Sequence, residues 1–202
     1  MKTYFIADTH FGHMNILKYE PIRIDEIWDT FYKDDPKFTK DSFKEFVLSL
    51  YENKTEDNMA QLKNILCQHD KMLIDNWNKV VKPLDTVWFL GDFSLVDKET
   101  TKELFSKLNG HIKMIMGNHD RYTPDFYRSC GVEYVSEYPI IVKKKIILSH
   151  APLNIAPECG MINVFGHVHS KVLNIESHEN NICICVEKLG FRPIRLSCYD
   201  KN

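Results

Sequence analysis

Five short motifs rich in histidine and aspartate constrain this chain more than any other feature, because each follows directly on a short apolar run. The motifs are Asp8-Thr9-His10, Gly91-Asp92, Gly117-Asn118-His119-Asp120, His150 and Gly166-His167-Val168-His169. The runs before them are Tyr4–Ala7, Val87–Leu90, Ile112–Met116, Ile146–Ser149 and Ile162–Phe165. These runs are rich in β-branched and aromatic residues and are too short for helices, so they predict strands.

The position of the motifs after predicted strands can bring residues that are distant in the sequence together. In open α/β sheets, the loops that follow the carboxyl ends of several strands converge on one crevice. A single histidine taken alone is more often an ordinary surface or core residue. Five motifs placed in this way are much harder to explain by chance, so we expect their side chains to gather at one edge of a sheet.

The side chains in these motifs are metal ligands by type. Carboxylate and imidazole together favour divalent Mn, Fe, Ni or Zn over an all-oxygen Mg or Ca site. Two such ions about 3.5 to 4 Å apart can share a bridging carboxylate, activate a bridging water and hold the oxygens of a phosphoryl group. Asp92 is the natural bridge. The motifs therefore predict two divalent metal ions, whose identity stays open.

Size and composition narrow the classes of protein to consider. The chain has 202 residues and is 44% hydrophobic, which predicts one domain with a full core. Its formal net charge of -2 argues against the broad basic surface of a dedicated duplex-DNA binder. No apolar run approaches the length of a membrane span and no signal peptide is recognisable, so we expect a soluble, cytoplasmic protein with no membrane partner. The six cysteines form no CxxC pair, which leaves a zinc knuckle unsupported.

Helical signals lie between the motifs. Ser42–Glu45 and Thr100–Glu103 both have the spacing of a capping box, and apolar residues follow each of them. The second box predicts a crossover helix that ends at Asn109-Gly110 and connects two parallel strands. From about Glu56, apolar residues recur at helical spacing until Pro83, which predicts a long helix.

Beyond residue 130 the chain becomes rich in predicted strands. They cover Tyr138–Val142, Lys145–Ser149, Asn163–Phe165, Val172–Ile175, Ile182–Val186 and Ile194–Leu196. Lys143–Lys145 is predicted to be an exposed hairpin tip, with phosphate binding as the minor alternative. The charged stretch from about residue 29 to 69 exceeds what a simple crossover needs, so we predict a single domain, residues 1–202, with a helical insertion there.

The ordered set of motifs resembles the calcineurin-like metallophosphoesterase superfamily, over residues 8 to 169. Phe11-Gly12-His13, an arginine soon after it and Val186-Glu187 resemble a bacterial and phage-type branch of that superfamily. The resemblance implies an α/β fold, a four-layer αββα sandwich with two mixed β-sheets. The second sheet of the family would accommodate the strands that follow residue 169.

The resemblance also implies a role for each motif residue. One metal would be held by Asp8, His10, Asp92 and His169, and the other by Asp92, Asn118, His150 and His167. His119 would bind no metal; it would face the phosphate and assist the leaving group while a metal-bridging hydroxide attacks phosphorus. Asp120 would orient the His119 imidazole, with a turn or cap role as the alternative.

His13 and Arg23 follow the first motif and are secondary candidates for substrate binding. The alternative for Arg23 is an ordinary surface salt bridge. Phe93-Ser94 follow Gly91-Asp92 where the protein Ser/Thr phosphatases of this superfamily place an aspartate and an arginine, and the paired histidines of Gly166–His169 also differ from those enzymes. We therefore do not expect a protein phosphatase.

The predicted function is hydrolysis of phosphodiester or phosphomonoester bonds in a small phosphorylated substrate that resembles a nucleotide. One alternative is a nuclease that acts on single strands, which would need a groove lined by basic and aromatic residues; nucleic acid is thus a partner that we do not favour. A second alternative is a non-catalytic binding protein with the same fold, and the retained His119 and complete ligand set argue against it. The oligomeric state stays open.

Overall fold

The computed structural model describes residues 1–172 and 180–200, and it divides into two compact units. Residues 1–11 and 76–202 form the unit that we call the sandwich unit, and residues 12–75 form the helical unit. Within the described ranges, no helix combines the length and the apolar character that a membrane span requires.

The first sheet of the sandwich unit consists of four parallel strands in the order β1-β2-β3-β4. They are β1 (Thr3–Ile6), β2 (Thr86–Phe89), β3 (His111–Ile115) and β4 (Tyr134–Ser136). The first three confirm strands predicted from apolar runs, whereas β4 was not predicted. α5 (Lys98–Ser106) connects β2 to β3 and α6 (Pro124–Ser129) connects β3 to β4, as a right-twisted parallel sheet requires.

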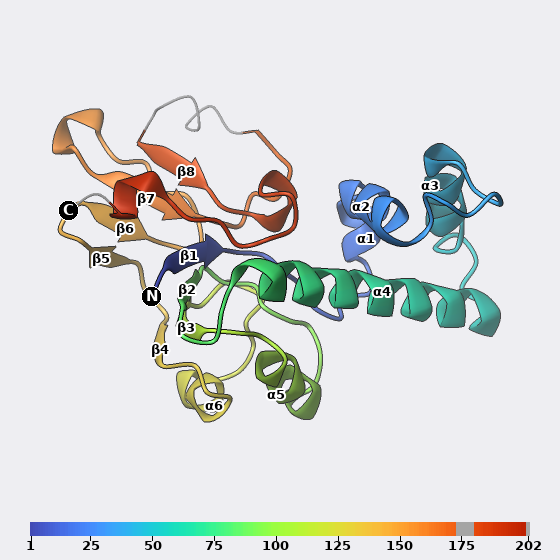
Figure 1. Ribbon diagram of the computed structural model, residues 1–202, viewed down its shortest axis with the longest axis horizontal. Helices are drawn as coiled ribbons and strands as arrows, with labels where there is room; N and C mark the ends of the chain where they lie inside the picture. The colour runs from blue at the N-terminus through green and yellow to red at the C-terminus, as the bar shows by residue number, and fades with distance from the viewer. Residues whose placement is uncertain (173–179, 201–202) are drawn as a thin grey trace. The chain divides into compact units, whose positions relative to one another are not determined.

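Aromatic residues join the first sheet to the helices beside it, among them α5 and α6, whose ribbons lie next to this sheet in Figure 1. Phe93, in the loop after β2, stacks on Phe105 of α5 with ring centroids 3.8 Å apart. Phe105 meets Tyr127 of α6 edge to face, and Phe89 lies beside Trp77 near the end of α4 (Glu56–Val80). All five rings are buried. This packing fixes the loop that carries Asp92.

The second sheet has the order β5-β6-β7-β8. Its strands are β5 (Ile140–Val142), β6 (Ile146–Leu148), β7 (Ile162–Phe165) and β8 (Asn181–Cys183). β5 and β6 pair antiparallel, while β6, β7 and β8 run parallel. Lys143 and Lys144 between β5 and β6 have φ of 51° and 64°, the left-handed values of a tight hairpin turn. The predicted hairpin tip is confirmed.

The hydrophobic core lies between the two sheets. Phe5 and Trp88 from the first sheet pack in one cluster with Leu148 and Val164 from the second, and Ile184 after β8 joins them. The α/β sandwich predicted from the resemblance is therefore confirmed. Among the described strands, mixed pairing is confined to the second sheet.

Two predicted strands near the end of the chain have a different outcome. Ile194–Leu196 forms a single antiparallel bridge, in which Ile194 and Phe5 exchange backbone hydrogen bonds of 2.8 and 3.1 Å. Val172 is exposed and lies outside any strand, and residues 173–175 fall outside the described residues. The remaining short elements are η1 (Pro157–Cys159), η3 (Val186–Lys188) and α7 (Ser197–Asp200).

The helical unit contains α1 (Ile16–Tyr19), α2 (Ile22–Phe31), α3 (Lys40–Ser49) and α4 up to residue 75. The predicted insertion at 29–69 lies inside this unit. α4 confirms the long helix expected from about Glu56 to Pro83.

Both predicted capping boxes are displaced by one turn. α3 begins after Thr39, whose extended backbone lets its hydroxyl accept the backbone N–H of Ser42, so Ser42 occupies the third helical position and not the cap. α5 begins after Asp97, whose carboxylate accepts the N–H of Thr100 in the same way. In both places a polar residue three positions earlier competes successfully for the cap.

Candidate metal centre

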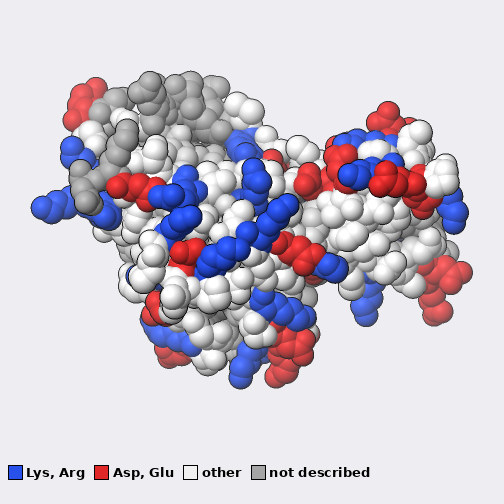
Figure 2. All heavy atoms as spheres, in the orientation of Figure 1, with Lys and Arg blue, Asp and Glu red and all other residues white. Residues whose placement is uncertain are grey.

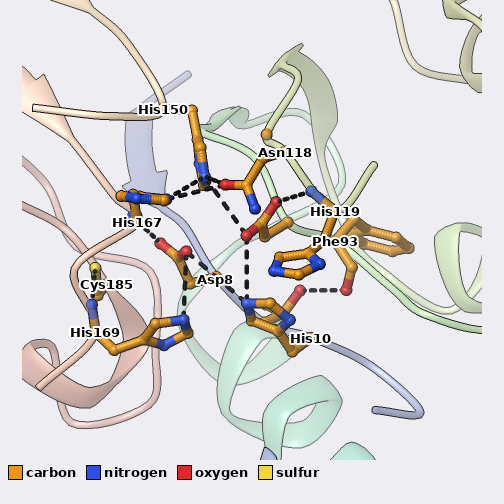
Figure 3. Close-up of polar contacts among 12 residues, drawn as sticks. Asp8, His10, Phe93, Asn118, His119, His150, His167, His169 and Cys185 are labelled. Atoms are coloured by element: carbon orange, nitrogen blue, oxygen red, sulfur yellow. Dashed lines mark hydrogen bonds and ion pairs between the residues drawn. The ribbon is translucent and has the colours of Figure 1, made fainter. Parts of the chain in front are cut away.

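The five motifs meet at the carboxyl ends of strands from both sheets of the sandwich unit. Backbone hydrogen bonds tie their loops together: the N–H of Asp8 donates to Gly91 O (2.9 Å), that of His10 to Asp92 O (3.0 Å), and that of Gly166 to His150 O (2.8 Å). Figure 3 shows the side chains pointing toward one another. The sheet geometry thus brings together residues from position 8 to position 169.

Five of the seven predicted ligands have a left-handed backbone. Their φ values are 61° for Asp8, 50° for His10, 61° for Asp92, 72° for His167 and 54° for His169. Non-glycine residues seldom adopt this region, and each instance costs about 1 to 3 kcal/mol and persists only where the surroundings hold it. Such strain clusters at functional sites, so its concentration in these loops marks them as a site.

The motif glycines are explained by close approach. Gly91 has φ of 90°, and a Cβ there would lie 2.6 Å from Gly117 N and 2.6 Å from His150 Nδ1. A Cβ on Gly166 would lie 2.6 Å from Ala7 Cβ and would also collide with an Asp8 carboxylate oxygen. Any side chain at these positions would push the ligands apart.

The first group of candidate ligands is Asp8, His10 and His169, whose donor atoms all lie within 4.8 Å of one another. The Nε2 atoms of His10 and His169 are each 4.0 Å from Asp8 Oδ1. The other oxygen of Asp8 accepts the backbone N–H of His167 at 2.9 Å. This hydrogen bond fixes the carboxylate with Oδ1 toward both imidazoles.

The second group is Asp92, His150 and His167, and Asn118 lies with it. Asn118 Oδ1 is 2.9 Å from His150 Nε2 and 2.9 Å from His167 Nδ1, and the two nitrogens are 3.1 Å apart. His150 Nδ1 lies 2.8 Å from the carbonyl oxygen of Leu90, which can only accept, so Nδ1 carries a proton, and in the neutral imidazole that a metal requires, the Nε2 lone pair faces the group.

This triangle of atoms fits a bound cation. Ligand atoms about 2.1 Å from a metal and at right angles to each other lie about 3.0 Å apart, which matches the spacings in the second group. A carbonyl oxygen and an imidazole lone pair offer no proton to each other, so a cation between them resolves the contact. The residues present therefore fit a divalent metal ion.

Asp92 lies between the two groups. Its Oδ2 is 3.4 Å from His10 Nε2 and 3.5 Å from His150 Nε2, while its Oδ1 accepts the backbone N–H of His119 at 2.8 Å. One carboxylate oxygen is thus within reach of imidazoles from both groups. This is the position expected of a carboxylate that bridges two ions.

Protonation in the site follows from burial and charge. Burial raises the pKa of Asp8 to about 7 against the opposing charges of His150 and His169. Burial would also raise the pKa of Asp92, but contact with His150 and the hydrogen bond from His119 hold it below its ordinary value. Burial would lower the pKa of His150, but Asp92 and Asp8 raise it to about 9. The site therefore attracts positive charge.

His119 lies beside the ligands. Its ring centroid is 5.4 Å from that of His10, and the side chain is partly exposed. Among the described residues, His119 belongs to neither group of candidate ligands. Figure 3 shows its ring turned toward the same space as the side chains of the candidate ligands. This placement suits a residue that acts on a substrate near the metals.

Asp120 connects two loops of the site by accepting hydrogen bonds from their backbone N–H groups. Its Oδ2 accepts the backbone N–H groups of Asp92 (2.8 Å) and Gly117 (2.7 Å), and its Oδ1 accepts that of Phe93 (2.9 Å). Burial raises its pKa to about 6 against these hydrogen bonds. The contacts match the turn-stabilising alternative, and orientation of His119 by Asp120 stays a prediction.

His13 and Arg23 belong to the helical unit. Arg23 is fully buried, and its Nη1 lies 3.1 Å from Nε2 of His69, whose Nδ1 lies 3.0 Å from Asp70 Oδ1. The surface salt bridge offered as an alternative for Arg23 is therefore wrong. The His13 ring lies beside Tyr19 with centroids 6.0 Å apart. Substrate binding by either residue stays a prediction.

Sequence reasoning did not assign two residues that hold His169. Glu187 lies with its Oε1 2.9 Å from His169 Nδ1, and the Cys185 sulfur accepts the backbone N–H of His169 at 3.2 Å. Cys185 is buried beside Phe165, as predicted for a small hydrophobic residue, but it also makes this polar contact. The resemblance of Val186-Glu187 to one branch of the superfamily was the available signal.

Comparisons with known proteins bear on the fold and the family of this chain. The uncharacterised protein MJ1445 of Methanocaldococcus jannaschii is 31% identical over 206 residues, which cover 96% of this chain and 87% of the relative. The crystal structure of AQ665 from Aquifex aeolicus, a protein of unknown function, superimposes with a TM-score of 0.58 and 23% identity over 95% of this chain and 94% of the other, which supports the fold alone. The family model for calcineurin-like phosphoesterases matches residues 1–181. The chain therefore belongs to the calcineurin-like phosphoesterase family.

Proposed function

We propose that this protein is a phosphoesterase that uses two divalent metal ions to hydrolyse phosphodiester or phosphomonoester bonds in small, nucleotide-like substrates. Membership of the calcineurin-like family and the two candidate ligand groups support metal-dependent phosphoester hydrolysis. The observation that carries the two-metal proposal is the position of Asp92, whose Oδ2 faces imidazoles of both groups.

The residues divide between two ion positions. Asp8, His10, His169 and Asp92 would hold one ion, and Asn118, His150, His167 and Asp92 would hold the other. When bound, divalent ions polarise phosphoryl oxygens and lower the pKa of a coordinated water toward neutrality. The mixed carboxylate and imidazole set favours Mn, Fe, Ni or Zn.

His119 is proposed to donate a proton to the oxygen of the leaving group. Its backbone N–H is anchored on Asp92 Oδ1, so the residue keeps a fixed relation to the bridging carboxylate. Its ring is partly exposed and lies beside His10, where a substrate phosphate bound at the metals would be within reach. Both alkoxide and phenolate leaving groups benefit from such help.

The residues after Asp92 support a substrate other than a phosphoprotein. Phe93 is fully buried against Phe105, and the Ser94 hydroxyl lies 3.0 Å from the Thr101 hydroxyl in the interior. These two positions therefore contribute to the core and not to a substrate-binding surface. On the face drawn in Figure 2, Lys and Arg are interspersed with Asp and Glu, which gives no support to a continuous basic channel for single-stranded nucleic acid.

Turnover assays test the proposal directly. The purified protein, loaded with Mn²⁺, is assayed on p-nitrophenyl phosphate and bis-p-nitrophenyl phosphate, and then on nucleotides, cyclic nucleotides and dinucleoside polyphosphates. We expect hydrolysis that disappears on chelation and in Asp92→Ala. A protein that binds Mn²⁺ and yet cleaves none of these esters would contradict the proposal and would favour a non-catalytic binding protein.

A further inference from the structure

The segment that carries Glu187 is tied to the strand that carries the first metal motif. Ala7, next to Asp8, forms a parallel bridge with Cys185, and its carbonyl accepts the N–H of Val186 at 3.2 Å. Glu187 follows in η3 with its side chain completely buried. The carboxylate of Glu187 is therefore held beside the first ligand group by the same backbone that positions Asp8.

The contact between Glu187 and His169 fixes which imidazole nitrogen can bind a metal. A carboxylate only accepts, so the His169 Nδ1 that lies 2.9 Å from Glu187 carries the proton. The unprotonated Nε2 then faces Asp8 Oδ1, 4.0 Å away. The other neutral tautomer would place a proton where a cation has to be.

We propose that Glu187 is a positioning residue that orients His169 and sets the affinity of the first metal position, an inference that rests on the proposed two-metal function. Carboxylates that accept a hydrogen bond from a metal-binding imidazole fix its tautomer and raise its basicity. Glu187 also places a second buried carboxylate next to Asp8, and this charge favours a divalent cation. Cys185 Sγ, which accepts the N–H of His169, secures the left-handed backbone at that residue.

The second ligand group has no need of Glu187, and this makes the proposal selective. His150 is oriented through its Nδ1 by the carbonyl oxygen of Leu90, a backbone group that side-chain substitution leaves in place. A change at Glu187 should therefore weaken one ion and spare the other. A residue that merely supported the fold would weaken both.

The test is a titration of the metal-free protein with Mn²⁺, in which binding is monitored by calorimetry and by electron paramagnetic resonance. Wild type should bind two ions. Glu187→Ala should keep one ion at wild-type affinity and bind the other roughly 10- to 100-fold more weakly. Glu187→Gln keeps an oxygen that can accept from Nδ1 but loses the charge, so it should show a smaller loss and serves as the test if the alanine variant does not fold.

The chain provides a matched control. His111 Nδ1 lies 2.6 Å from Glu133 Oε1, an exposed pair at the start of β3 and hence at the opposite edge of the sheet from the site. Glu133→Gln should leave both affinities unchanged. In a double-mutant cycle, Glu187→Gln should have no further effect once His169 is replaced by alanine, because it acts through that imidazole.

The outcomes separate this inference from the proposed function. Wild-type affinity for both ions in Glu187→Gln and Glu187→Ala, or equal weakening of both ions, would overturn the inference. The titration needs no substrate, so it tests the role of Glu187 independently of turnover. If wild type binds two ions and hydrolyses none of the esters, the proposed function is contradicted and the inference about Glu187 is not. Failure of wild type to bind Mn²⁺ would overturn both.

Discussion

The two units of this protein both bury polar and charged side chains, but they satisfy them differently. In the helical unit, the Arg23 guanidinium meets Nε2 of His69, and Nδ1 of His69 meets the Asp70 carboxylate, which also accepts the N–H of Gly12 at 3.0 Å. Each of these three contacts joins a donor to an acceptor. In the sandwich unit, Asn118 Oδ1, His150 Nε2 and His167 Nδ1 lie within 3.1 Å of one another, and a neutral His150, whose Nδ1 donates to Leu90, has no proton to offer to the other two atoms.

The match between donors and acceptors distinguishes a structural polar network from a cation site. A buried polar network in which donors and acceptors match is complete as it stands and stabilises the fold. A buried cluster in which lone pairs converge requires a cation, either a proton or a metal. The raised pKa of His150, about 9, expresses the same demand. The following predictions, ordered by expected effect on the metal centre, test this contrast.

The largest effect is expected from loss of the carboxylate between the two groups. Asp92→Ala should abolish phosphoesterase activity and weaken both metal positions, because Oδ2 of Asp92 faces His10 and His150. Asp92→Asn is the matched variant that keeps the shape but not the charge. Metal content and turnover are the measurements, and full occupancy of both positions in Asp92→Ala would show that Asp92 is not a bridge.

His119 should affect chemistry without affecting metal binding. His119→Ala is expected to slow turnover roughly 100- to 10,000-fold, the usual loss when acid-base help is removed. Metal stoichiometry should stay at the wild-type value because the imidazole belongs to neither described ligand group. The assay pairs steady-state kinetics with metal analysis, and an empty metal centre in this variant would assign His119 to the ligands.

Metal affinity should rise with pH. The pKa values of Asp8 and His150 are raised to about 7 and about 9 from ordinary values of 3.8 and 6.5, so the folded metal-free protein holds these protons more tightly than the unfolded chain. Protonation of Asp8 and His150 therefore stabilises the folded metal-free protein. This contribution is fully present below the ordinary pKa values and is lost as pH rises through 7 for Asp8 and then through 9 for His150. His167, whose pKa is lowered by burial and by the charge of His150, works in the opposite direction.

Thermal unfolding at pH 6, 7 and 8 measures this effect. Because metal binding displaces the same protons, the stabilisation by Mn²⁺ should increase over this range while the metal-free protein becomes less stable. Stabilisation by metal that is strongest at pH 6 would contradict the assignment of these groups as ligands.

The smallest effect on the metal centre is expected from the helical unit. Arg23→Met should lower the free energy of unfolding by about 1 to 3 kcal/mol, because it leaves His69 without one of its buried partners. Binding of Mn²⁺ to the sandwich unit should not change. Denaturant unfolding and metal titration of the same variant test both statements. A loss of metal affinity as large as the loss of stability would show that the polar network of the helical unit also supports the metal centre.

The convergence of the candidate ligands was easier to predict from the sequence than their surroundings, because these residues follow strands. Asp8 and Asp92 follow parallel strands of the first sheet, whose carboxyl ends meet at one edge whatever the length of chain between them, and His150 follows a strand of the second sheet that ends at the same site. The sandwich was predicted from the resemblance of these motifs to a known superfamily, and not from the strand pattern itself. The motif glycines gave a further local signal, since Gly91 and Gly166 lie where no side chain fits.

Features that depend on packing between helices, or on contacts made by the segment near Glu187, were not predictable in this way. Arg23 and His69 are 46 positions apart on two helices, and no motif links them. The helices are capped by Thr39 and Asp97 and not by Ser42 and Thr100, and the sequence offered both polar residues of each pair as possible caps. Glu187 reaches His169 through a bridge between Ala7 and Cys185 that only the folded chain reveals.

The proposed two-metal centre requires that two cations occupy the space between Asp8, Asp92 and Asn118. Anomalous diffraction from crystals grown with Mn²⁺ would locate these cations. We expect two peaks that share Asp92, one with Asp8, His10 and His169 and the other with Asn118, His150 and His167. A single peak, or peaks away from Asp92, would contradict the proposed two-metal centre.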